Sequence, residues 1–88
     1  MRLKATKTRL YALVLAHYPD IPPARQTEFV KAPRHRSWWL KFTMKDDFGA
    51  VFFSTCMGVA LLSFTCGCTR DVIKIPLDEL RKFDLVEE

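Results

Sequence analysis

The stretch that decides the fold is Trp-Trp-Leu-Lys-Phe-Thr-Met at residues 38–44. On one face, its apolar side chains fall at every second position: Trp38, Leu40, Phe42 and Met44. A period of two indicates a strand with one buried face. Lys-Asp-Asp-Phe-Gly at 45–49 then predicts a turn, because Asp side chains bond the nearby backbone and Gly accepts positive φ. The stretch therefore predicts the first arm of a hairpin.

Two uncharged segments follow, at 50–56 and 59–66. They are rich in β-branched and aromatic residues, and strands without a polar face are usually covered on both sides. Gly58 supplies a reversal between them, although Met-Gly is not a favoured hairpin pair. A further turn at 66–71 leads into a fourth, shorter strand at 72–75.

Helices are predicted before and after these strands in the chain. Leu10, Leu13 and Val14 have helical spacing, Thr8 is available as a cap, and the residue before Pro19 avoids helical angles. A helix over about 9–18 is therefore expected, with a buried strand as the alternative.

The segment 24–31 predicts a short helix opened by Pro23, or a loop, since its apolar content is thin. After Pro76, residues 77–83 predict a helix with acids in the first turn and bases in the last, where the helix dipole favours each.

These elements predict the α+β class in a single domain, residues 1–88. Its centre is a small antiparallel sheet of three to four strands, at about 37–45, 50–56, 59–66 and 72–75. A single membrane span over 48–68 is a less favoured interpretation of the same stretch. Those 21 residues carry no charge, and about 20 apolar residues cross a bilayer, but ten of them are Gly, Ser, Thr or Cys.

Charge is distributed unevenly along the chain. Residues 1–45 hold ten Lys or Arg against two acids, a net +8, whereas residues 46–88 hold four against eight, a net −4. The first half therefore suggests an anionic partner. The alternative is that the two halves neutralise each other in the fold.

The predicted binding site combines basic and aromatic side chains: Arg34, His35, Arg36, Trp39, Lys41 and Lys45. An exposed aromatic ring among cations can stack on single-stranded bases while the cations neutralise phosphates. The same residue types form hot spots of protein interfaces. The alternative is that Trp39 belongs to the core and the cations only surround it.

The cysteines Cys56, Cys66 and Cys68 are odd in number, and no secretory signal is evident at the start of the chain. A reducing, cytoplasmic setting with buried thiols is expected. A zinc site with His17 or His35 is a weaker hypothesis, because Cys66 and Cys68 are separated by one residue instead of two to four.

Catalytic motifs are not found. Asp46 and Asp47 could hold a metal for nuclease chemistry with Glu28 or Asp71, but adjacent Asp residues before Gly are more typical of a turn.

We therefore predict a non-enzymatic interaction protein without a cofactor or small-molecule substrate. Its expected partner is a nucleic acid or a nucleoprotein assembly. The second hypothesis is a small regulator or inhibitor that docks on a larger protein. Self-association into a homodimer is a further hypothesis, motivated by the two uncharged strands.

Overall fold

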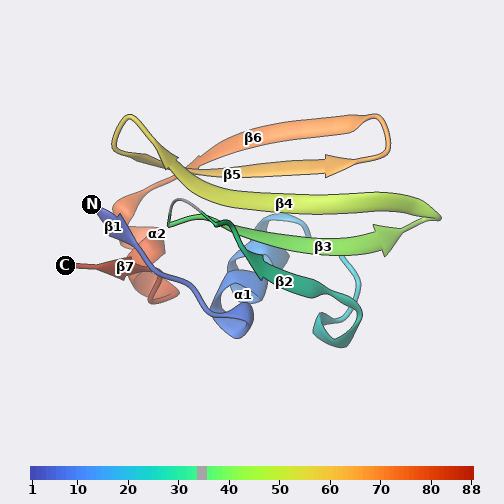
Figure 1. Cartoon of the computed structure of the whole chain (residues 1–88), viewed down its shortest axis with the longest axis horizontal. Coiled ribbons are helices and arrows are strands. Elements are labelled where there is room, and N and C mark those ends of the chain that lie inside the picture. Colours follow the sequence, from blue (N-terminus) through green and yellow to red (C-terminus); the bar gives the residue numbers. More distant parts are fainter. Residues whose placement is uncertain (34–35) are drawn as a thin grey trace.

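The computed structural model of the chain describes residues 1–33 and 36–88 (Figure 1). The main sheet is antiparallel with the order β2-β3-β4-β5-β6. Its strands are β2 (Glu28–Lys31), β3 (Trp38–Met44), β4 (Asp47–Cys56), β5 (Val59–Cys66) and β6 (Thr69–Ile75). The remaining elements are β1 (Arg2–Leu3), α1 (Lys7–His17), a 3-10 turn (Ala24–Gln26), α2 (Leu77–Lys82) and β7 (Val86–Glu87). The α+β class and both helices are confirmed, and the sheet is larger than predicted.

The turn between β3 and β4 is shorter than the sequence suggested. Met44 pairs with Asp47, so the first turn contains only Lys45 and Asp46, both with positive φ (52° and 64°). A two-residue turn with two positive φ values matches the twist of the flanking strands. β4 therefore starts at Asp47 instead of residue 50, and the prediction of a five-residue turn was wrong.

The two later turns also contain two residues each. Met57 and Gly58 take positive φ (52° and 78°) between β4 and β5, where the reversal was predicted. Cys66 pairs with Thr69, so only Gly67 and Cys68 connect β5 to β6. The short turn lets β6 begin at Thr69, three residues before the predicted start at 72.

The first helix begins earlier than predicted because its cap is Thr6 and not Thr8. Thr6 has extended backbone angles, and its hydroxyl accepts a hydrogen bond from the Arg9 amide at 3.2 Å. Such a side chain satisfies one of the free amides at a helix start. The helix ends at His17, before Pro19 as expected.

β2 corrects the prediction of a helix or loop over 24–31. Only Ala24–Gln26 is helical, and Glu28–Lys31 pairs along the edge of β3. Phe29 packs against the core, whereas Val30 lies opposite Trp39. The alternation in β2 is too short to identify without its partner strand.

The chain ends pair with each other as β1 and β7, which the sequence analysis missed. Arg2 lies opposite Glu87, and Leu3 lies opposite Val86. Leu3 and Val86 are both buried. Two-residue strands carry no periodic signal, so only tertiary packing defines them.

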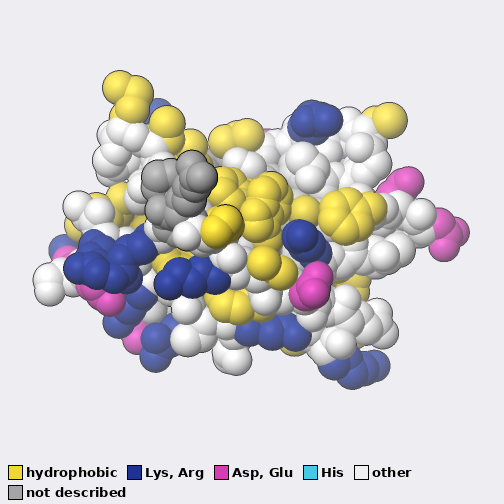
Figure 2. All heavy atoms as spheres, viewed as in Figure 1, with side chains coloured by type: hydrophobic (Ala, Val, Ile, Leu, Met, Phe, Trp, Pro, Cys, Tyr) yellow, Lys and Arg dark blue, Asp and Glu magenta, His cyan; other side chains and the backbone are white. Residues whose placement is uncertain are grey.

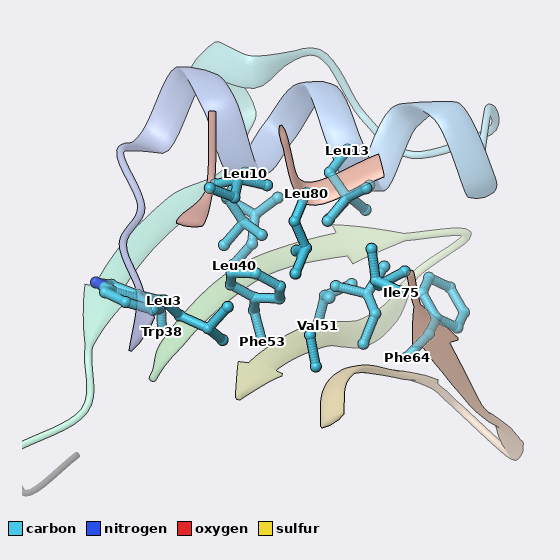
Figure 3. Packing of buried hydrophobic residues seen from close by; sticks show 14 of the residues in the cluster. Leu3, Leu10, Leu13, Trp38, Leu40, Val51, Phe53, Phe64, Ile75 and Leu80 are labelled. Atoms are coloured by element: carbon cyan, nitrogen blue, oxygen red, sulfur yellow. The ribbon is translucent and has the colours of Figure 1, made fainter. Parts of the chain in front are cut away.

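The core lies between one face of the main sheet and the two helices. Figure 3 shows Leu10 and Leu13 of α1 and Leu80 of α2 facing Leu40, Val51 and Phe53 of the sheet. All six side chains are fully buried. We expected cover on both faces of the central strands, but no described helix lies over the opposite face. Among the residues that the structure describes, that face is therefore not covered by a helix or by a second sheet.

Residues 48–68, which met the length criterion for a membrane span, form most of β4, all of β5 and the adjoining turns. Within residues 1–33 and 36–88, no helix has the length and apolar character needed to cross a membrane.

Candidate functional site

The face of the main sheet that points away from α1 and α2 carries the candidate site. We call it the open face and define it by the strand positions that alternate with the core-facing ones: Glu28, Val30, Trp39, Lys41, Thr43, Phe48, Ala50, Phe52, Ser54, Leu61, Ser63, Thr65, Arg70, Val72 and Lys74. Figure 2 shows hydrophobic side chains gathered over the middle strands, with Lys and Arg side chains around them.

An aromatic pair lies at the centre of the open face. Trp39 and Phe52 are directly opposite each other on β3 and β4, and their ring centroids are 4.3 Å apart with 36° between the planes. Both side chains are only half-buried. The same row continues to Val30 on β2 and to Val72 on β6, which is 62% exposed. An almost continuous apolar row thus crosses all five strands.

Cations border this row on both sides. Lys41 and Arg70 belong to the adjacent row, together with Glu28, and Lys74 lies on the other side next to Leu61. None of the three cations forms an ion pair with any residue that the structure describes. Glu28 is the one acid among the side chains that define the open face. The face therefore carries an excess of two positive charges.

A second aromatic position lies near the tip of the β3–β4 hairpin. Phe48 is opposite Thr43 and is 66% exposed. It lines a hollow of about 420 Å³ between this hairpin and the 3-10 turn, together with Arg25 and Lys41. Lys41 therefore lies between the central aromatic pair and Phe48.

The structure brings two of the predicted site residues together on the open face, places a third at its border and separates a fourth from it. Trp39 and Lys41 share the open face, as their spacing predicted. Lys45 lies in the turn after β3 and lines a different hollow with His17, Tyr18 and Phe64. Its positive φ takes it out of the strand alternation on which its assignment depended.

Arg36 lies at the border of the open face, in a hollow also lined by Phe52 and Ser54. Its guanidinium donates to the Leu3 carbonyl at 3.5 Å and pairs with Glu87 at 3.7 Å. Arg34 and His35, the other two predicted residues, lie outside the described part of the chain.

Ion pairs between the two ends of the chain account for part of its charge asymmetry. Asp84 pairs with Lys4 at 2.9 Å and with Arg9 at 3.0 Å. Glu87 pairs with Arg2 at 3.2 Å and also with Arg36. Mutual neutralisation, the alternative interpretation, therefore applies to these four cations. It does not apply to Lys41, which belongs to the same basic half.

The cysteines do not gather into one site. Cys56 ends β4 beside its turn, whereas Cys66 ends β5 at the opposite end of the same hairpin. Cys56 and Cys68 are exposed, which differs from the expectation of buried thiols, and Cys66 is half-buried. Across the described residues, no three His, Cys, Asp or Glu side chains are arranged to hold a metal ion.

Sequence reasoning missed several residues of the open face: Phe48, Phe52, Arg70, Val72 and Lys74. Phe48 was assigned to the turn, and Arg70 to the turn before β6, because both turns were expected to be longer. Phe52 was treated as a residue covered on both sides. Residues 50–56 carry no charged side chain, so the sequence does not show whether Phe52 or Phe53 points to the core.

Comparisons with known proteins do not add to this description. The chain matches no protein-family model, and neither a curated protein nor a solved structure is significantly similar to it.

Proposed function

We propose that this protein is a non-enzymatic module that binds nucleic acid through the open face. The observation that carries the proposal is the half-exposed pair of Trp39 and Phe52 on an uncovered sheet, bordered by three cations without ion-pair partners in the described chain. Aromatic side chains stack on bases, which contributes about 1–3 kcal/mol per base, and cations neutralise the backbone.

Charge complementarity favours a polyanion, and not a second copy of the chain, as the ligand of the open face. Two open faces that met would bring Lys41, Arg70 and Lys74 of both copies into one interface, with only Glu28 of each copy to oppose them. Like charges in close contact are unfavourable, and more so when water is removed. A nucleic acid instead supplies negative charge along its whole length.

A second candidate, a regulator that docks on a larger protein, is supported by the apolar character of the row. Val72 is 62% exposed, and Leu61 is its diagonal neighbour on β5, directly opposite Lys74. A docked protein would bury the exposed side chain of Val72, so Val72→Ala should lower the affinity for such a partner. The same change would have little effect on nucleic-acid binding, because Val72 offers neither a ring nor a charge.

Fluorescence anisotropy with labelled single-stranded DNA, duplex DNA and RNA tests the proposal. We expect affinity to fall steeply with salt, with a logarithmic slope of about 0.7 per neutralised phosphate on a single strand. Replacing Lys41, Arg70 and Lys74 by Gln should reduce that slope by about 2 and lower the affinity for every sequence.

The matched control replaces three exposed cations elsewhere: Lys31, Arg81 and Lys82. Lys31 lies opposite the buried Trp38, and the other two belong to α2, so all three are on the helical side of the sheet. The control protein has the same net charge as the open-face variant. Equal losses in both variants would indicate binding by net charge alone, and the open face would then not be the site.

A further inference from the structure

The open face has two aromatic positions along one strand, with a lysine beside the midpoint. Phe48 and Phe52 are four residues apart on β4 and point to the same side, which places their Cα atoms about 13 Å apart at roughly 3.3 Å per residue. Ala50 lies midway between them, directly opposite Lys41 on β3. Along the hairpin, the pair of Trp39 and Phe52 is therefore followed by Lys41 and then by the ring of Phe48.

This order suits a nucleic-acid strand whose bases are free to turn. In a duplex, bases are stacked about 3.4 Å apart along the axis, so their flat faces are covered and only their edges are reachable in the grooves. Rings on a sheet surface can stack only on uncovered base faces. Two stacking positions about 13 Å apart, several times the stacking distance, require bases that have separated from each other.

Resting on the proposed function, we infer that the ligand of the open face is an unstacked single strand that runs along the β3–β4 hairpin. One base stacks on the pair of Trp39 and Phe52, and a second stacks on Phe48. The connecting backbone passes Lys41, whose ammonium group neutralises a phosphate. The hollow of about 420 Å³ beside Phe48 gives the second base space next to Arg25.

The first test separates base stacking from phosphate contact. The probes are a labelled hexathymidylate, a hexamer with the same backbone in which every nucleotide lacks its base, and a short blunt duplex. We expect the hexathymidylate to bind at least about fivefold more tightly than the other two, since each stacked base adds affinity. Hexauridylate is included to compare RNA with DNA, and we expect it to bind as hexathymidylate does. Equal affinity for the base-free hexamer, or tighter binding of the duplex than of both single strands, would overturn the inference.

The second test addresses Phe48 directly. Phe48→Ala should lower the affinity for the hexathymidylate at least about fivefold, whereas Phe48→Tyr, which keeps the ring, should not. Leu15→Ala is the control, because Leu15 is an exposed apolar side chain of α1, on the other side of the sheet from the open face. Phe48→Ala should leave binding of the base-free hexamer unchanged. Unchanged affinity of Phe48→Ala for the hexathymidylate would remove Phe48 from the site.

The outcomes of these tests distinguish a failure of this inference from a failure of the proposed function on which it rests. If the wild-type protein binds none of the probes at low salt, the proposed function fails and the inference fails with it. If the protein binds and depends on Lys41, Arg70 and Lys74, but Phe48 and the bases make no difference, the proposed function stands and the inference is wrong. Thermal unfolding of each variant excludes loss of fold as the cause.

Discussion

The ring of Tyr18 lies flat on the ring of Phe64, with centroids 4.3 Å apart and 13° between the planes. The Tyr18 hydroxyl also donates a hydrogen bond to the Asp71 carboxylate at 2.7 Å. A single residue at the end of α1 thus contacts β5 through its ring and β6 through its hydroxyl. This contact fixes the end of the helix over the sheet, on the face opposite the proposed binding site.

Replacing Tyr18 by Phe should keep the stacking and remove only the hydrogen bond. Because the bond is solvent-exposed, we expect the free energy of unfolding to fall by about 0.5–1 kcal/mol at neutral pH. Tyr18→Ala should cost more, since it also removes the stacked ring. Urea denaturation of both variants measures the two contributions, and equal losses would mean that the ring contributes nothing.

The same residue predicts a change in stability at alkaline pH. Partial burial, together with the hydrogen bond to Asp71 and the charge of its carboxylate, raises the pKa of Tyr18 well above its ordinary value. A raised pKa means that folding favours the neutral phenol. Its contribution is complete below the unfolded pKa of about 10 and is lost as pH rises towards the folded value.

The advantage of wild type over Tyr18→Phe should therefore shrink above about pH 10. Denaturation at a series of pH values measures it. A difference between the two proteins that stays constant up to pH 11 would contradict this explanation.

Asp84 connects the C-terminal end of α2 to the basic N-terminus and should contribute stability that depends on pH and salt. The hydrogen bond from Lys4 is the main cause that lowers the pKa of this carboxyl, and the charges of Arg9 and Lys4 add to it. A lowered pKa gives stability above the unfolded value of about 3.9, which is lost as pH falls through the folded value.

Asp84→Asn tests this charge without disturbing the backbone. Asp84 has a φ of 56°, and the amides of Asp84 and Leu85 bond back to the carbonyls of Arg81 and Leu80, so it occupies the left-handed position that ends a helix. Asn tolerates this conformation. We expect lower stability than wild type at pH 7 and low salt, and a difference that shrinks as the pH falls below about 4 or as the salt is raised to about 1 M. Asp84→Ala should be less stable under all of these conditions, because it also adds backbone strain.

Gly49 should not tolerate a side chain, although it lies within a strand. It is directly opposite the buried Phe42, and an added Cβ would lie 2.8 Å from Cδ1 of that ring and closer still to Cε1. Gly49→Ala should therefore lower the free energy of unfolding by about 1–3 kcal/mol through overpacking. Adding Phe42→Leu to that variant should recover part of the loss. Stability equal to wild type for Gly49→Ala alone would show that the ring moves aside freely.

The parts of the fold that could be predicted from the sequence are those with a long periodic pattern. β3 shows its alternation clearly, and the first helix shows its spacing of three and four residues. The turn at Met57 and Gly58 lies where the sequence predicted it, because Gly58 marks the reversal. The turn before β4 could not be placed to the residue, because Lys45 and Asp46 take positive φ without being Gly or Asn. The length of this turn also decides which residues belong to the site. Because the turn contains two residues instead of five, Phe48 lies on the sheet and Lys45 does not.

The sequence also does not show on which side of the sheet each uncharged residue lies. Val51 and Phe53 face α1 and α2, whereas Phe52 faces outward beside Trp39, and all three are apolar. Trp39 could be assigned to the outer face because Lys41 marks that face in β3. β4 contains no such mark between Ala50 and Cys56, so only the cross-strand register shows that Phe52 belongs to the site.

Phe52 and Phe53 are neighbours on β4 that face opposite ways, so the same substitution in each should have different effects. Phe53 is fully buried beside Trp38, with ring centroids 5.9 Å apart, and Phe53→Leu should cost about 1 kcal/mol of stability while leaving affinity for a single strand unchanged. Phe52→Leu keeps an apolar side chain but removes the ring that lies against Trp39, so affinity should fall about fivefold with a smaller loss of stability. Urea denaturation and anisotropy on the same preparations measure both quantities. Equal losses of affinity in the two variants would mean that binding follows the integrity of the fold and not the ring of Phe52.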